Sequence, residues 1–350
     1  MNKMNSKKTR IGSIFIGGGE KIAVQSMLNA PAHDIEKNIS QAAELKGAGC
    51  DIIRISVPDK EAVKTLYEVK NKVDIPLVAD IHFDWRLAIE SCEAGADKIR
   101  INPGNIGAKE HIKAVADKCR QCSVPIRIGV NSGSLEKDIL AKFGSPSAKA
   151  MVESGMYHIS LLEKFDFDNI VLSLKSSDVK TTYDSYVLAY EKCGYPLHLG
   201  VTEAGTEYMG TLRSAAGIGG LLLRGIGDTI RVSLTDDPVK EVKAGIDILK
   251  SIGLRKEGIR FISCPTCGRT SIDLIKLAKS AEEKLSGIDK NITVAIMGCV
   301  VNGPGEAKEA DIGIAGGKNC GVLFKHGKIL KSNIKEECLL EALSEEIKKM

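Results

Sequence analysis

The 350-residue sequence has few aromatic side chains, only a small net charge and no long apolar run. Phe, Trp and Tyr together make up 4% of the residues, and the formal net charge is +4. A nucleic-acid-binding surface normally needs a clustered basic face with aromatic side chains that stack on bases, so this composition argues against nucleic acid as a partner. No uncharged apolar run approaches the roughly 18 residues of a membrane span, and residues 1–21 contain no apolar region of the signal-peptide type. We therefore expect a cytoplasmic protein that binds neither membranes nor nucleic acid.

Short runs of β-branched residues recur along the first two thirds of the chain. They begin near Val24, Asp51, Pro76, Lys98, Pro125, Asn169, Leu197 and Thr229. Helical patterns lie between them, and strands that alternate with helices of this size predict a parallel sheet. Eight such units fit a closed TIM (β/α)8 barrel, over residues 1–256, better than an open doubly wound sheet. The longest gap leaves room for an extra helix around residues 146–164.

The pattern changes after the helix expected at residues 238–252. A new set of predicted strands and helices begins with the segment GIRFIS. A helix near residues 272–285 and the strand ITVAIM follow it. Short strands near Ile312 and over residues 322–330, and a last charged helix, complete it. We expect a separate, small α/β domain over residues 257–350.

Basic and polar residues gather where the barrel strands end, which is where TIM barrels carry their active sites. They are Arg54, Arg100, Arg127, Asn131, Lys175, His198, Arg231 and Ser233. The acids at these positions, Asp80 and Glu203, are fewer. One or two of the cations could belong to structural ion pairs, but their excess favours an anion site, because arginine forks suit the oxygens of phosphate groups.

The cysteines fall into two groups. Five of them precede strands and are expected to pack at the bottom of the barrel: Cys50, Cys92, Cys119, Cys122 and Cys193. The pair Cys264 and Cys267 instead lies in a Pro- and Gly-containing turn after a strand, and Cys299 directly follows a later strand. Three such thiolates need a fourth ligand. Cys320 would complete a zinc site, whereas Glu306 would suit an iron–sulfur cluster with one reactive iron, and the spacing leaves both open.

Seven motifs, in order, resemble the bacterial 4-hydroxy-3-methylbut-2-enyl diphosphate synthase family. They are VADIHFD, RINPGNIG, RIGVNSGSLEKD, LHLGVTEAG, GIGDTIRVSL, CPTCGR and GCVVNGPGEA. The family consists of iron–sulfur reductases of the non-mevalonate isoprenoid pathway. The resemblance implies a TIM barrel followed by a small domain similar to a sulfite/nitrite-reductase repeat, without the middle domain of the plant-type form.

The resemblance also implies a reaction and its residues. The substrate would be 2-C-methyl-D-erythritol 2,4-cyclodiphosphate, and a [4Fe–4S] cluster would bind to Cys264, Cys267, Cys299 and Glu306. Two electrons, delivered singly by reduced flavodoxin or ferredoxin, would open the ring and expel a hydroxyl as water. The phosphates would be held by Arg54, Arg100, Arg127 and Lys175, with Asn131, His198, Arg231 and Ser233 in support. Glu203 is the first candidate for proton donor and Asp80 the second.

The family works as a head-to-tail homodimer, and the chain supports this expectation. The connection over residues 253–260 spans at most roughly 26–29 Å, which is short for a chain that must round the barrel and reach its mouth. We therefore expect each site to combine two subunits. The main alternative is a class I aldolase-like barrel with a Schiff base on Lys175 and a structural metal site. A further alternative, an iron–sulfur electron carrier, leaves the cationic mouth unexplained.

Overall fold

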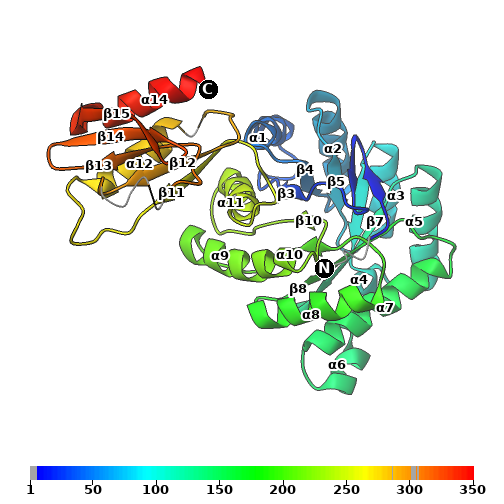
Figure 1. The fold of residues 1–350 in the computed structure, drawn as a ribbon. Coiled ribbons are helices and arrows are strands. Elements are labelled where there is room, and N and C mark those ends of the chain that lie inside the picture. Colours follow the sequence, from blue (N-terminus) through cyan, green and yellow to red (C-terminus); the bar gives the residue numbers. More distant parts are fainter. Residues whose placement is uncertain (1–5, 286, 301–304, 306) are drawn as a thin grey trace. The chain divides into compact units, whose positions relative to one another are not determined.

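The computed structural model describes residues 6–285, 287–300, 305 and 307–350. Contacts along the chain divide it into two units, Met1–Leu254 and Arg255–Met350, and each unit is described by itself (Figure 1). Within the described residues, no helix combines the length and apolar character needed to cross a membrane.

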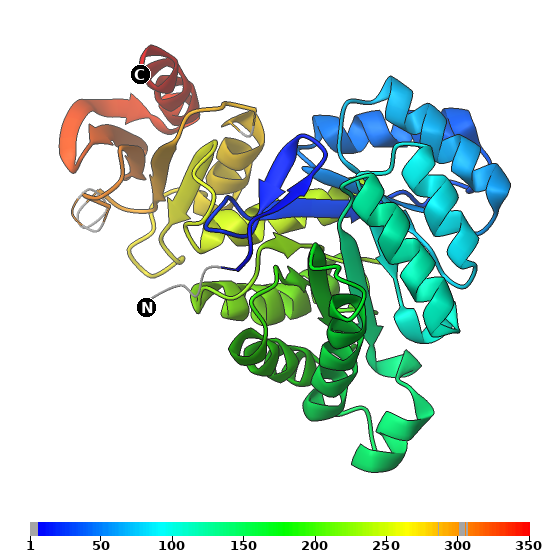
Figure 2. The same cartoon turned by 90° about the vertical axis from the view of Figure 1, so that its right-hand side faces the viewer.

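The first unit is a TIM barrel, which confirms the expected fold (Figure 2). Its parallel strands are β3 (Ala23–Met27), β4 (Ile52–Ser56), β5 (Leu77–Asp80), β6 (Lys98–Ile101), β7 (Ile126–Asn131), β8 (Ile170–Lys175), β9 (His198–Leu199) and β10 (Thr229–Ile230). Hydrogen bonding runs in the order β8-β7-β6-β5-β4-β3-β10-β9. A parallel bridge between Leu172 and Leu197 joins the two ends of this order, so the sheet closes on itself.

Helices follow the strands and cover the outside of the barrel. They are α1 (Ile35–Gly47), α2 (Lys60–Lys72), α3 (Trp85–Glu93), α4 (Pro103–Ile106), α5 (Lys109–Gln121), α6 (Lys137–Phe143), α7 (Ala148–Glu163), α8 (Val179–Lys192), α9 (Glu207–Ser214), α10 (Gly220–Leu223) and α11 (Pro238–Ser251). Several begin at an aspartate whose carboxylate accepts a hydrogen bond from a backbone N–H of the first turn, as Asp59 does for α2 and Asp178 for α8.

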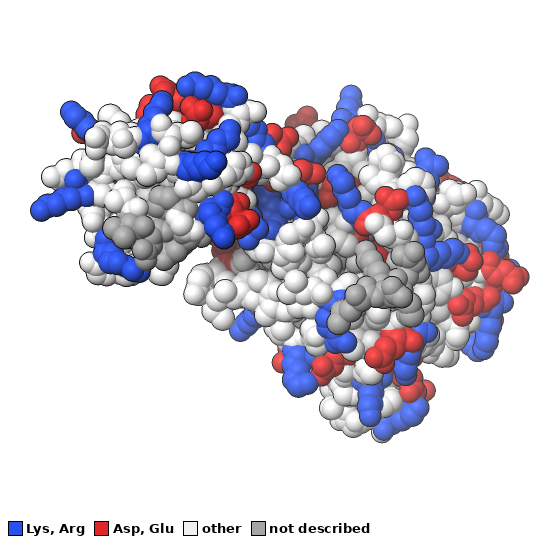
Figure 3. Space-filling view, in the orientation of Figure 1, with Lys and Arg blue, Asp and Glu red and all other residues white. Residues whose placement is uncertain are grey.

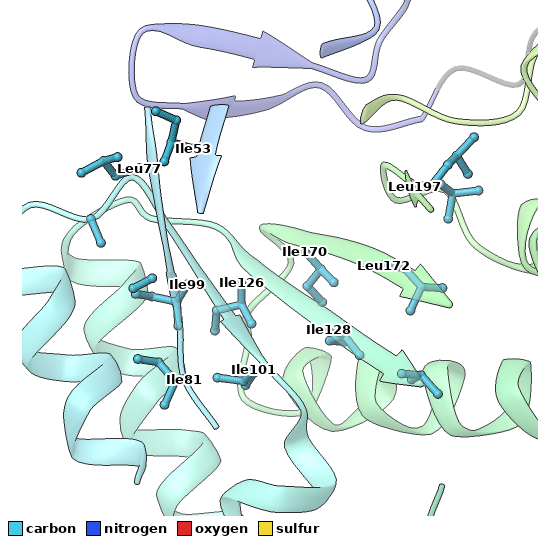
Figure 4. Close-up of a cluster of buried hydrophobic side chains, with 14 of the residues drawn as sticks. Ile53, Leu77, Ile81, Ile99, Ile101, Ile126, Ile128, Ile170, Leu172 and Leu197 are labelled. Carbon is cyan, nitrogen blue, oxygen red and sulfur yellow. The ribbon is translucent and has the colours of Figure 1, made fainter. Parts of the chain in front are cut away.

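Side chains alternate along each barrel strand between the helices and the barrel interior. Ile99, Ile101, Ile126, Ile128 and Ile170 belong to the apolar core that packs against the helices (Figure 4). The residues between them, such as Arg100 on β6 and Arg127 on β7, therefore face the interior. This alternation decides which residues can form a site inside the barrel.

A hairpin that the sequence pattern did not predict packs against the barrel strands near their N-terminal ends. Its strands are β1 (Thr9–Ile11) and β2 (Ile14–Ile16), which pair antiparallel. The side chains of Ile11 and Ile16 are fully buried in a small apolar cluster with Ile52, Val78 and Val171. This end of the interior is therefore apolar, and polar chemistry is confined to the layers above it.

Two local expectations need correction. The helix expected around residues 146–164 is α7, which takes the ordinary place beside β7 and β8, and the extra helix is the shorter α6 before it. The glycine-rich segment GIGGLLLRGIG before β10 predicts turns and close packing. In place of turns, residues Ala215–Gly219 form a π-helical segment that continues into α10. The packing is close, because a Cβ atom on Gly217 would lie 3.1 Å from a side-chain atom of Val201.

In its described residues, the second unit has a five-stranded sheet and the helices α12 and α14. Its elements are β11 (Ile259–Ser263), α12 (Leu274–Leu285), β12 (Ile292–Met297), β13 (Ile312–Gly316), β14 (Cys320–Lys325), β15 (Lys328–Lys335) and α14 (Leu339–Lys349). The strands pair in chain order, parallel from β11 to β13 and antiparallel from β13 to β15. The sequence predicted strands near residues 312 and 322–330; the latter stretch spans β14 and β15, which turn at His326 and Gly327, both with positive φ.

Candidate active site

The centre of the barrel mouth is an aspartate held by two arginines. Asp80, at the end of β5, accepts hydrogen bonds from Arg54 Nη2 at 2.9 Å and from Arg100 Nη1 at 3.1 Å. His82 Nε2 lies 3.2 Å from the same carboxylate. Burial by itself would raise the pKa of the Asp80 carboxyl, but the charges of Arg54 and Arg100 and the contact with His82 outweigh it and hold that pKa well below its usual range. Asp80 is therefore ionised, and it fixes both guanidinium groups.

Three further basic residues in the interior have no such anionic partner among the described residues. Arg127 is buried, and its Nε and Nη1 atoms form no hydrogen bond within the described part of the chain. Burial and the charges of neighbouring arginines lower the pKa of Arg127. Burial and the charges of Arg127 and Arg231 lower the pKa of Lys175. Burial and the charges of Arg127 and Lys175 likewise lower the pKa of His198. The Nδ1 atom of His198 lies 2.7 Å from Thr229 Oγ1. Together these side chains form a basic layer in the barrel interior whose positive charge the described acids compensate only in part.

Glycines make room for these cations. A Cβ atom on Gly129 would lie 2.5 Å from Arg100 Nε, and one on Gly200 would lie 2.6 Å from Lys175 Nζ. Contacts below 3.0 Å do not occur for real Cβ atoms, so a side chain at either position would displace the cation. The long basic side chains therefore lie flat against bare backbone on β7 and just after β9.

Arg231, directly after β10, pairs with an acid that the sequence pattern did not single out. Its Nη2 and Nε lie 3.2 Å from Oε1 and Oε2 of Glu241 on α11. Ser26 Oγ on β3 donates to the same carboxylate at 2.9 Å, and the backbone N–H of Leu234 donates at 3.0 Å. Glu241 is 4% exposed. The only sequence signal for this pair was the position of Glu241 in the first turn of a helix that follows a barrel strand.

Lys98 is a second residue that the sequence pattern did not single out. It precedes Arg100 by two positions on β6, so it faces the interior one layer deeper. Its side chain is fully buried, and its Nζ forms no hydrogen bond within the described residues. Burial and the charges of Arg127 and Arg54 lower the pKa of Lys98 well below its usual range. The amide of Gln25 on β3 is also buried without a described partner. An inward-facing lysine at the start of a barrel strand was the signal.

The remaining expected site residues lie at the upper rim. Asn131 is the last residue of β7 and lies opposite Lys175 in the strand register, and Ser233 follows Arg231 by two positions. Glu203 is exposed in the segment between β9 and α9, with a φ of 52°. Left-handed backbone at a non-glycine residue is uncommon and concentrates at functional positions.

In the second unit, two of the expected metal ligands follow neighbouring strands. Cys264 comes directly after β11, and Cys299 lies two residues beyond β12. Ser263 pairs with Ile296, so the two strands end side by side, and the backbone N–H of Gly298 donates to Cys264 Sγ at 3.1 Å. Cys320 lies at the same end of the sheet, because β14 runs antiparallel to β13. Glu306 lies outside the described residues.

The cysteines of the barrel behave as expected, with one exception. Cys50, Cys92 and Cys119 are buried and Cys193 is partly buried, and the sulfur atoms of Cys92 and Cys119 lie 3.6 Å apart. Cys122 is exposed, so the expectation that it packs inside the protein is wrong. It is the C-cap residue that directly follows α5.

Comparison with known proteins shows the family. Residues 6–246 match the model of the GcpE TIM-barrel domain, and residues 260–349 match that of the GcpE protein C-terminal domain. The chain belongs to the GcpE family. The protein of Clostridium perfringens is 57% identical to it over 98% of both chains, and that of Caldanaerobacter subterraneus subsp. tengcongensis is 59% identical over 99% of this chain and 97% of the relative. Both relatives are named 4-hydroxy-3-methylbut-2-en-1-yl diphosphate synthase (flavodoxin).

A solved structure supports the barrel fold of the GcpE-family chain. The crystal structure of 3-dehydroquinate dehydratase from Geobacillus kaustophilus matches with a TM-score of 0.50 and 15% identity, over 71% of this chain and 98% of that one. At this identity the likeness concerns the fold alone.

The donor set of the second unit fits an iron–sulfur cluster. No three His, Cys, Asp or Glu side chains gather at metal-binding distance among the residues that the structure describes. The three thiols are nevertheless partly or fully exposed at one end of the sheet, and the Gly298 N–H···S bond is of the kind that tunes cluster sulfurs. Hydrogen bonds from the backbone and side chain of Arg269 lower the pKa of the Cys267 thiol, which favours the thiolate that binds iron.

The Glu241 pair leads to a prediction about stability. We expect Glu241→Gln to lower the free energy of unfolding of the barrel by about 1.5–3 kcal/mol, because it leaves the buried guanidinium of Arg231 without its counter-charge. Trp85, the one tryptophan of the chain, lies on α3, so its fluorescence during urea denaturation reports on the barrel.

The matched control is Glu153→Gln, which removes an exposed ion pair with Lys142. We expect this variant to change the unfolding free energy by no more than about 0.5 kcal/mol. Equal effects of the two substitutions would mean that the Glu241 pair contributes no more than a surface ion pair.

Proposed function

We propose that the barrel binds 2-C-methyl-D-erythritol 2,4-cyclodiphosphate and that the protein reduces it to 4-hydroxy-3-methylbut-2-enyl diphosphate. The observation that carries the proposal is the excess of cations in the barrel interior. Arg127, Lys175 and Lys98 have no acid bound to them among the described residues, whereas Asp80 and Glu241 are already shared with other arginines. A ligand with two phosphate groups supplies the missing negative charge. The names of the relatives, of which the chain covers nearly the whole length, support this choice of ligand.

The arginines and lysines of the interior have distinct roles in this proposal. Asp80 holds the guanidinium groups of Arg54 and Arg100 in a fixed orientation. The N–H groups that do not bind Asp80 can then donate to a phosphate. Arg127 and Lys175 contribute charge from a desolvated position, where interaction with an anion is strongest. His198, with a lowered pKa, is neutral and can donate or accept a hydrogen bond from Nε2. Asn131 and Ser233 supply polar contacts at the rim.

Glu203 is the proposed proton donor. It is exposed at the upper rim and is held in a left-handed backbone conformation. Asp80 is poorly suited to this role, because two arginines hold its carboxylate in the ionised form. In our proposal Asp80 is therefore a positioning residue for Arg54 and Arg100.

The second unit would hold a [4Fe–4S] cluster on Cys264, Cys267 and Cys299, with Glu306 as the fourth ligand. When bound, such a cluster supplies single electrons at low potential. In the overall reaction two electrons and two protons enter, the ring opens, and one hydroxyl leaves as water, so the product has one oxygen fewer than the substrate. A reduced flavodoxin or ferredoxin is the proposed electron donor, and the relatives' names favour flavodoxin. The cytoplasmic location stays a prediction.

An anaerobic assay of the iron-loaded enzyme tests the function. We expect it to consume the cyclodiphosphate and release the allylic diphosphate when reduced methyl viologen supplies electrons. Arg100→Ala should weaken binding of the cyclodiphosphate by about 1.5–3 kcal/mol, the contribution of a charged hydrogen bond. Arg86→Ala, which removes an exposed pair with Asp84, is the control and should leave binding unchanged.

The aldolase-like alternative makes a different prediction for the same samples. Its buried, desolvated Lys175 amine would form a Schiff base, as such lysines do. Trapping of a carbonyl substrate on Lys175 by borohydride, together with no turnover of the cyclodiphosphate, would contradict the reductase.

We further propose a head-to-tail homodimer, in which the barrel of one subunit works with the thiol-bearing unit of the other. The connection between α11 and β11, residues 252–258, supports this, because it spans at most about 23–25 Å and α11 alone is about 21 Å long. Co-expressed Cys264→Ala and Glu203→Ala chains should then regain activity, since one of the two sites in a mixed dimer is intact. Purified mixed dimers that remain as inactive as the separate variants would exclude shared sites.

A further inference from the structure

A basic strip lies at the thiol-bearing end of the second unit. The segment Ile312–Lys335 contains five lysines, at 318, 325, 328, 331 and 335, and no aspartate or glutamate. Lys318, Lys331 and Lys335, which we call the basic strip, are exposed. In Figure 3, lysine and arginine side chains project from the part of the molecule where Figure 1 draws β13, β14 and β15.

The strand register places the basic strip beside the cysteines. Lys335, the last residue of β15, lies opposite Cys320, the first residue of β14. Lys318 lies in the turn between β13 and β14, and a Cβ atom on its neighbour Gly317 would lie 3.4 Å from a side-chain atom of Val300, which follows Cys299. Lys331 is four residues from Lys335, or about 13 Å along a strand. The strip therefore begins next to the loop that carries Cys299 and extends along the open edge of the sheet.

Exposed apolar side chains accompany the strip. Ile329 and Leu330 on β15 are 57% and 48% exposed, and Val300 is 38% exposed. Small apolar areas surrounded by charged residues are typical of protein interfaces with a polar rim. Weak electron-transfer complexes bury less than about 1,200 Å² of total surface, so docking of a carrier does not require a large apolar patch.

Lysines on an edge strand also have a simpler explanation, because they prevent another strand from pairing with the open edge. This explains Lys328, Lys331 and Lys335, which all lie on β15. It does not explain Lys318, which lies in a turn and not on the edge strand, or why that turn touches the cysteine loop. The grouping of charge at the end of the sheet where the thiols lie therefore points to a partner that must approach that end.

We propose that the basic strip docks an acidic one-electron carrier protein of the flavodoxin class. The inference rests on the proposed function, because the carrier would bring the electrons that the reduction consumes. Opposite charges speed the encounter of two proteins and orient them before contact, and salt screens this effect. A carrier bound to the strip lies beside the end of the sheet that carries Cys264 and Cys299.

Charge reversal on the iron-loaded enzyme tests the docking site. Lys318→Glu/Lys335→Glu should lower kcat/KM for a reduced bacterial flavodoxin about tenfold or more at low ionic strength, because steering becomes repulsion. The loss should shrink at high salt, and the rate with reduced methyl viologen, a small reductant that needs no docking surface, should stay the same. The dissociation constant of oxidised flavodoxin, measured by calorimetry, should rise in parallel.

The matched control is Lys348→Glu/Lys349→Glu, which changes the net charge equally. Both lysines are exposed at the end of α14, away from β15 and its apolar side chains. The control should keep flavodoxin affinity within about twofold. An equal loss in both variants, or no loss in the first, would overturn the docking site.

A neutral double variant and the measured dissociation constants of flavodoxin separate the docking site from other effects. If charge reversal also lowers the methyl viologen rate, the neutral variant Lys318→Gln/Lys335→Gln is measured in its place, with the same expected direction. If the wild-type protein shows no turnover with methyl viologen, the proposed function fails, and the flavodoxin dissociation constants still decide the docking site. Aggregation of the variants with unchanged flavodoxin affinity would assign the lysines to edge protection alone.

Discussion

Mutual repulsion of buried cations is the constraint on which the rest of the barrel depends. Arg54, Arg100, Arg127, Lys175 and Arg231 all come from different strands and meet in one interior. Burying unpaired charge is costly, so such a set is stable only if acids and polar groups hold part of it. Asp80 and Glu241 do this for three of the arginines. What they leave uncompensated is the charge that an anionic ligand would neutralise.

The fold accommodates this set because it separates apolar packing from polar chemistry. Outward-facing isoleucines and leucines pack against the helices, and the hairpin residues Ile11 and Ile16 fill the apolar end of the interior. Glycines at 129 and 200 replace the side chains that would otherwise collide with Arg100 and Lys175. Stability therefore comes from layers outside and below the cations, so the interior itself can hold groups that repel one another.

Much of this could be predicted from the sequence because strand and helix periods are local signals. All eight strands begin within one residue of the positions expected from runs such as KIRIN and PIRIGV, although β9 and β10 end earlier than their runs. The partner of Arg231 was not predicted, because Glu241 is ten residues away on a helix and its position is typical of an ordinary solvent-exposed acid. Lys98 was missed because a lysine at a strand start usually faces solvent, and only closure of the barrel buries it. The β1–β2 hairpin was missed because its two strands have three residues each.

Proton uptake on ligand binding tests the account most directly. Burial and neighbouring cations lower the pKa values of Lys98 and Lys175 in the free protein, and a bound dianion should raise them again. Calorimetric titration with the cyclodiphosphate, in buffers of different ionisation enthalpy, measures the protons exchanged. The account predicts net uptake between the free and the bound pKa values, and a smaller uptake with weaker binding in Lys98→Met. Binding without proton exchange, equally tight in the wild type and in Lys98→Met, would contradict it.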